Sequence, residues 1–172
     1  MLKRLLLAFL LLVPAFSWAQ EFGGLIVLES TITTTETAYA DHDQIDSVKT
    51  LSNAFSGTSR KGVIESITVL DKVSQSSALT LYFFDESPTV ASSDNAALNI
   101  TDAELADKAV CKAEIAAASY QTFSASTLSS TLNVGCVVSS LSKDLFMVVQ
   151  SAGTPDYTAG TDLVVKIGLR RL

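Results

Sequence analysis

The heptapeptide LVVKIGL at residues 163–169 decides the fold class of this chain. Period-two alternation of this kind is typical of a β-strand with one buried face. The face predicted to be buried carries Leu163, Val165, Ile167 and Leu169. The opposite face carries a lysine and a glycine, so we expect it to be at least partly exposed to solvent.

Short apolar runs of the same kind recur along the chain, and clusters of turn-forming residues separate them. The segment 78–85 places bulky residues on both faces, which predicts a central strand covered on each side. With 163–169, the expected strands are 25–34, 44–51, 63–73, 78–85, 109–117, 131–138 and 145–151. Eight strands and very little helical periodicity predict an all-β fold, an antiparallel β-sandwich that resembles a jelly roll.

One short helix is expected in a connection between strands. Thr101 and Glu104 have the spacing of a capping box, which satisfies free amides at a helix start. The helix should therefore run from Asp102 to about Asp107. Glycine, proline, asparagine, aspartate and serine mark the expected loops at 56–62, 86–97, 124–130 and 153–160.

The first nineteen residues have the pattern of an export signal. Lys3 and Arg4 precede an apolar run at 5–16, and small residues at Ser17 and Ala19 suit a signal peptidase. We expect cleavage before Gln20 and an exported protein, either periplasmic or extracellular at the cell surface. The predicted organisation is a signal peptide at 1–19, an N-terminal strand segment at 20–37 and a β-sandwich domain at 38–172.

The charge balance narrows the expected partners. Removal of 1–19 takes away two basic residues and no acidic ones, so 10 Lys and Arg remain against 18 Asp and Glu, a net charge of −8. An acidic surface repels phosphate backbones, which disfavours nucleic-acid binding. No later apolar run approaches the roughly 20 residues that cross a bilayer, so no transmembrane segment is expected after cleavage.

The two cysteines, Cys111 and Cys136, are interpreted as one disulfide because an oxidising compartment favours the bond. The alternative is a pair of buried free thiols that pack as small apolar groups.

A metal site is one interpretation of Asp41, His42 and Asp43. In a strand the two aspartates would share one face and His42 would point to the other, so the three could converge only in a turn. The segment also lacks the glycine and spacing of an EF-hand. A solvated polar turn is the favoured alternative, and we expect no bound metal and no cofactor.

Catalytic signatures are weak in this sequence. No serine lies in a Gly-x-Ser-x-Gly elbow, and a triad would have to use the single histidine, His42. The acid pairs 85–86 and 94 with 102 could flank a glycosidic bond, but such loop acids are common in acidic domains. Some aromatic residues could line a sugar-binding face, although most lie in apolar runs that favour the core; they are Phe55, Tyr82, Phe83, Phe84, Tyr120, Phe123, Phe146 and Tyr157. The only tryptophan, Trp18, lies in the predicted signal, which weakens this interpretation. We therefore expect no enzyme.

Several segments carry a resemblance to a known family. They are AYAD at 38–41, DQI at 43–45, SITVLDK at 66–72, LTLYFFD at 79–85, SPT at 87–89, DNAA at 94–97, GTPDYT at 153–158 and the end of the chain from 162 to 169. In this order they resemble small, largely uncharacterised proteins encoded among tailed-phage virion and prophage genes. The resemblance spans about 38–169. It implies a structural or decoration-like β-sandwich protein with no assigned catalytic residues.

Together these observations predict an exported, non-enzymatic structural or adhesive β-sandwich protein that associates with itself or with an envelope or surface partner. The segment 25–34 could pair with the sheet edge of a neighbour. The alternative is an extracellular module that binds a glycan or calcium.

Overall fold

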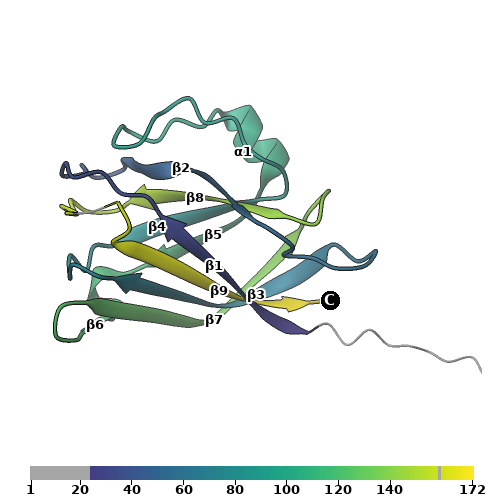
Figure 1. The fold of residues 1–172 in the computed structure, drawn as a ribbon. Coiled ribbons are helices and arrows are strands. Elements are labelled where there is room, and N and C mark those ends of the chain that lie inside the picture. Colours follow the sequence, from purple (N-terminus) through teal and green to yellow (C-terminus); the bar gives the residue numbers. More distant parts are fainter. Residues whose placement is uncertain (1–23, 159) are drawn as a thin grey trace, which may run out of the picture.

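The computed structural model describes residues 24–158 and 160–172, which form two antiparallel β-sheets packed face to face (Figure 1). The predicted signal at 1–19 and its cleavage before Gln20 lie outside the described residues. The strands are β1 Leu25–Ile32, β2 Gln44–Leu51, β3 Lys61–Asp71, β4 Leu79–Phe84, β5 Ala109–Ile115, β6 Tyr120–Thr122, β7 Thr127–Ser139, β8 Leu145–Ser151 and β9 Leu163–Arg171. The helix α1 spans Asp102–Lys108, and a 3-10 turn spans Ala117–Ser119.

The strand order is that of a jelly roll. One sheet has the order β1-β9-β3-β7-β6 and the other has the order β2-β8-β4-β5. If the short β6 is set aside, the antiparallel pairs are nested along the chain. β1 pairs with β9, β2 with β8, β3 with β7 and β4 with β5. The chain is therefore one long hairpin wrapped into two sheets, which confirms the predicted fold class.

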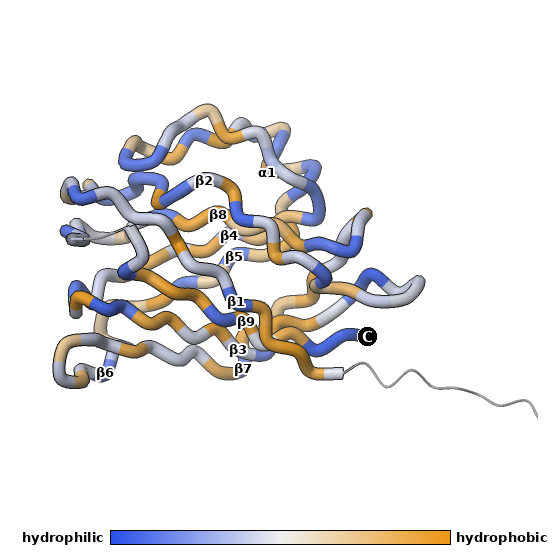
Figure 2. The backbone as a smooth tube through the Cα atoms, viewed as in Figure 1, coloured by the Kyte–Doolittle hydropathy of each residue, from blue (hydrophilic) through white to orange (hydrophobic). Residues whose placement is uncertain are grey.

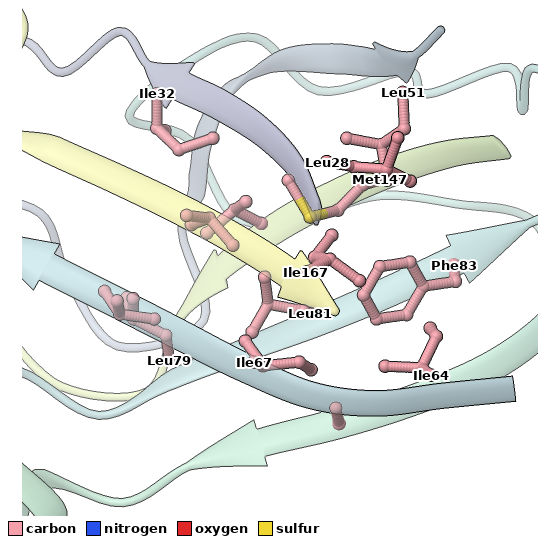
Figure 3. Packing of buried hydrophobic residues seen from close by; sticks show 14 of the residues in the cluster. Leu28, Ile32, Leu51, Ile64, Ile67, Leu79, Leu81, Phe83, Met147 and Ile167 are labelled. Atoms are coloured by element: carbon pink, nitrogen blue, oxygen red, sulfur yellow. The ribbon is translucent and has the colours of Figure 1, made fainter. Parts of the chain in front are cut away.

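The core lies between the two sheets. Ile67 and Ile167 from one sheet and Leu81 and Phe83 from the other are fully buried there, as Figure 3 shows. The alternation predicted for 163–169 is present in β9, because its four apolar residues at odd positions are inaccessible to solvent. Apolar side chains on alternate positions of both sheets therefore make the core of the domain.

The connection from β4 to β5 covers part of the outer face of the second sheet. It contains α1, which begins where the Thr101 hydroxyl accepts a hydrogen bond from the Glu104 amide at 3.3 Å, as the capping box predicts. Beneath this connection, Phe84 and Val148 are buried although they point away from the core. The prediction that β4 is central is confirmed, and its outer face is covered in part, because Phe84 is buried whereas Thr80 and Tyr82 line a pocket. No helix among the described residues is long and apolar enough to cross a membrane.

The structure corrects the sequence-based prediction for β7. Residues 127–130 were expected in a loop, yet they extend β7, and Ser129 is fully buried with its hydroxyl 2.6 Å from that of Ser119. The pairing of β3 with β7 shifts register between Ile64 and Ser66, and Asn133 in this part of β7 has a positive φ. This bulge turns Leu132 to the outer face, where it is exposed, instead of the core face expected from its spacing.

The predicted N-terminal segment 20–37 contributes β1 to the same sandwich. The eight residues of β1 all pair with β9, with Leu25 opposite Arg170 at one end and Ile32 opposite Leu163 at the other.

Candidate functional site

The predicted disulfide is present between Cys111 and Cys136, with the two Cα atoms 6.2 Å apart. Cys111 lies on β5 at the edge of one sheet, and Cys136 lies on β7 in the other sheet. The bond therefore joins the two layers of the sandwich directly.

The candidate metal ligands Asp41, His42 and Asp43 do not converge on one point. His42 has a positive φ and is exposed, and its Nδ1 lies 3.0 Å from Oδ2 of Asp41. Asp43 turns inward, is 8% exposed, and accepts a hydrogen bond of 2.7 Å from the Ala40 amide. Among the residues that the structure describes, no group of three His, Cys, Asp or Glu side chains could hold a metal ion. The geometry is that of a polar turn entering β2.

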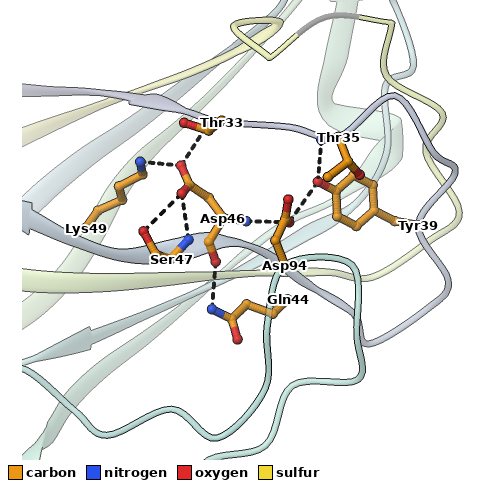
Figure 4. A network of polar contacts seen from close by, with 8 residues as sticks. All are labelled: Thr33, Thr35, Tyr39, Gln44, Asp46, Ser47, Lys49 and Asp94. Atoms are coloured by element: carbon orange, nitrogen blue, oxygen red, sulfur yellow. Dashed lines mark hydrogen bonds and ion pairs between the residues drawn. The ribbon is translucent and has the colours of Figure 1, made fainter.

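A polar network lies just beyond this turn, around Asp46 (Figure 4). The Asp46 carboxylate accepts hydrogen bonds from the Thr33 amide and the Ser47 amide, and it pairs with the Lys49 ammonium. The Asp46 amide donates to Asp94 at 2.8 Å. This network ties the start of the β1–β2 connection, the irregular part of β2 and the β4–β5 connection together.

Two pKa values in this network are shifted. Burial would raise the pKa of Asp46, but the Lys49 ammonium and the backbone amides outweigh it, so that pKa lies below its usual value of 3.8. Burial raises the pKa of Tyr39 to about 12, and its hydroxyl donates to Asp94 at 2.9 Å. At neutral pH the Asp46 carboxylate is therefore ionised and the Tyr39 phenol is neutral, which suits a structural role.

The acid pairs considered for glycoside cleavage lie in different surroundings. Asp94 accepts from the Tyr39 hydroxyl and the Asp46 amide, whereas Asp102 opens α1. Asp85 and Glu86 line a separate pocket of about 420 Å³.

Among residues 24–158 and 160–172, no strand pairs with the outer edge of β1. The Arg171 amide donates to the Gly24 carbonyl at 3.3 Å, so the even-numbered residues of β1 point their backbone groups toward β9. Leu25, Val27 and the other odd-numbered residues therefore present their N–H and C=O groups to the free edge. Their side chains lie on the outer face, where Leu25 and Val27 are each 66% exposed. Figure 2 shows this apolar stretch at the beginning of β1.

The other three sheet edges are protected. The start of β2 is covered by the β4–β5 connection, because the Gln44 amide donates to Ala96 and the Asn95 amide donates back to Gln44. Further along β2 the pairing is irregular. β6 pairs only with residues 127–129 of β7, and beyond them a bulge with positive φ at Asn133 and Gly135 makes the β7 edge irregular. β5 carries the exposed ion pair of Lys112 and Glu114 and is tied to β7 by the disulfide. Short, charged, irregular or covered edges resist pairing with another chain.

A pocket of about 500 Å³ lies on the outer face of the second sheet, beside the part that α1 and its flanking loop cover. We call it the β4 groove. Its polar lining consists of His42, Thr80, Tyr82, Lys112, Glu114 and Gln150. A smaller hollow of about 140 Å³ adjoins it, since Tyr82 and Gln150 line both.

No protein-family profile matches the sequence, and no curated protein resembles it closely enough to count as a relative. Among solved structures, one match is a chain from Desmodium yellow mottle tymovirus. It has a TM-score of 0.25 and 13% identity, and the match covers 98% of this chain and 87% of that chain. A TM-score this low carries no argument about fold or function, so the fold rests on the strand order described above.

Sequence reasoning did not find the β4 groove. Thr80 and Tyr82 alternate with core residues, which could have placed them on one outer face. Gln150 and Glu114 join them only through strand pairing, which the sequence did not specify.

Proposed function

We propose that this protein is an exported, non-enzymatic structural component of a cell surface or envelope, and that its copies associate through the free edge of β1. The observation that carries the proposal is the contrast between this edge and the other three. β1 has eight consecutive pairs with β9, and it contains no proline, lysine or bulge that would block pairing.

A second copy of the chain fits this edge. If two β1 strands pair antiparallel with Leu28 opposite Leu28, the four odd-numbered residues of each strand can all bond across the new junction. Leu25 then lies opposite Thr31, and Val27 lies opposite Glu29. No like charges face each other, and Glu29 is already neutralised by Lys166 at 3.0 Å in its own sheet.

Other apolar side chains are exposed on the same sheet face but lie away from the β1 edge. Leu132 and Val137 on β7 are 68% and 64% exposed. They lie on the same outer face as Leu25 and Val27, as the pairings across β9 and β3 require.

Export is supported by the signal-like residues 1–19, and the disulfide is compatible with an oxidising compartment. Mass measurement of the protein purified from a periplasmic or extracellular fraction tests this part. A chain beginning at Gln20 supports it, whereas an intact Met1 in a cytoplasmic fraction contradicts it.

Assembly is tested by sedimentation velocity of that processed protein over a wide concentration range. We expect reversible dimers that Val27→Glu weakens by at least about tenfold, because the new carboxylate faces Glu29 of the second copy twice per dimer. Val27→Pro should act similarly, since it removes an N–H that faces the free edge and no bond to β9.

Leu132→Glu is the matched control because it introduces the same charge at an equally exposed residue of the same face, far from the edge. It should leave dimerisation nearly unchanged. Equal loss in Val27→Glu and Leu132→Glu would mean that the sheet faces associate, which contradicts edge pairing. A strict monomer at every concentration would contradict the proposal as a whole.

A further inference from the structure

The β4 groove has the chemistry of a binding site, and it lies on the sheet opposite to the β1 edge. We propose that the β4 groove binds a neutral oligosaccharide. This inference is independent of self-assembly, because none of the groove residues belongs to β1 or its sheet.

The groove is built by strand pairing. Gln44, Gln150, Thr80 and Glu114 are directly opposite one another across β2, β8, β4 and β5, so they form one polar row over the whole sheet. Gln44 is 2% exposed and bonds to Asp46 and Ser92, whereas Gln150, Thr80 and Glu114 line the groove with amide, hydroxyl and carboxylate groups in a line, which suits a hydroxylated ligand.

Tyr82 lies in the next row, opposite Lys112 on one side and Val148 on the other. Its hydroxyl donates to the Gln150 side-chain carbonyl at 3.0 Å, and the Gln150 amide donates to the His42 carbonyl at 3.2 Å. These bonds fix the tyrosine and the glutamine before any ligand arrives, which lowers the ordering cost of binding.

The wall of the groove near Tyr82 comes from the β4–β5 connection. Leu98, Ile100 and Leu105 line the smaller hollow together with Tyr82 and Gln150. The connection also covers Gln44, so the part of the polar row that lines the groove consists of Gln150, Thr80 and Glu114, and a ligand could lie along these three residues.

Charge and size favour a neutral, hydroxylated ligand. Lys112 and Glu114 form an ion pair of 2.6 Å at the rim, so their formal charges cancel. The chain as a whole has a net charge of −6, which disfavours anionic ligands. Ala78, Ala116 and Ala152 supply small apolar surfaces beside the polar row, and about 500 Å³ is a usual volume for a ligand site.

The rim ion pair also gives both kinds of hydrogen-bonding group. The Glu114 carboxylate accepts from a sugar hydroxyl, and the Lys112 ammonium donates to one. Glu114 holds the pKa of Lys112 above its usual value, so that ammonium remains charged at neutral pH.

The test is an NMR titration of the isotope-labelled full mature protein with maltotriose, cellotriose and tri-N-acetylchitotriose, each at millimolar concentration. We expect at least one sugar to shift the amide signals of Thr80, Tyr82 and Gln150. Tyr82→Ala should weaken that binding by about tenfold or more, as for a central aromatic contact.

Since Tyr82 also packs under the β4–β5 connection, a second variant guards against a folding defect. Glu114→Gln changes an exposed side chain and should weaken binding severalfold without altering the thermal midpoint. Phe123→Ala is the matched control, because it removes an exposed aromatic ring outside the groove. Binding that survives both groove variants, shifts confined to other surfaces, or no shift with any of the three sugars would overturn the proposal.

Discussion

Removal of the Cys111–Cys136 disulfide should destabilise the domain by a predictable amount. The two cysteines are 25 residues apart in sequence. For a loop of this length the chain-entropy relation gives a loss of about 3.5 kcal/mol at 25 °C. Cysteine to alanine deletes only a sulfur, and Cys136 is already partly exposed, so lost packing should add little.

The assay is urea unfolding followed by far-ultraviolet circular dichroism, because the sole Trp18 lies within the predicted signal. Cys111→Ala, Cys136→Ala and the double variant should each lose about 3.5 kcal/mol, since each removes the same crosslink. A domain of this size should show a fall in thermal midpoint of roughly 7–14 °C.

Reduction of the wild-type protein should reproduce the loss seen in the variants. The reasoning is refuted if the free energy of unfolding changes by less than about 1 kcal/mol. It is also refuted if the two single variants differ widely, because local packing would then outweigh the crosslink.

Three further predictions concern stability. The pKa of Asp46 is lowered by folding, so its contribution is present above the pKa of the unfolded chain and is lost as the pH falls through the folded value. Urea midpoints measured from pH 7 down to 3 should therefore decline less in Asp46→Asn, and a decline equal to that of the wild type would contradict this role. Phe83→Ala should cost about 3–5 kcal/mol because the ring is fully buried between the sheets, and a loss below 1 kcal/mol would contradict the packing. Thr101→Ala should cost about 1 kcal/mol through loss of the helix cap, and an unchanged midpoint would show that this cap contributes nothing.

The sequence predicted the fold where alternation was clear. β2 and β8 have the bounds expected for them, and β9 begins at the expected residue. Local apolar spacing sufficed for β9 because no bulge interrupts it between Leu163 and Leu169. β2 has the expected bounds although its pairing with β8 shifts register between Ile45 and Lys49.

The same reasoning failed where tertiary contacts determine the outcome. The serine-rich start of β7 joins the sheet because pairing with β3 satisfies its backbone, and buried hydroxyls such as that of Ser129 bond to another serine. The bulge that exposes Leu132 depends on backbone conformations at Asn133 and Gly135 that alternation does not encode. The β4 groove likewise depends on which strands are neighbours, so the site could not be assembled from the sequence.

Residue-resolved amide hydrogen exchange in β1, measured at low and high protein concentration, tests the proposed assembly most directly. The N–H groups of Leu25, Val27, Glu29 and Thr31 face the free edge, so they should exchange quickly in the monomer and become protected as the concentration rises. The even-numbered residues, already bonded to β9, should stay protected throughout. Fast exchange at the four odd-numbered residues in a sample that sedimentation shows to be assembled would contradict pairing through β1.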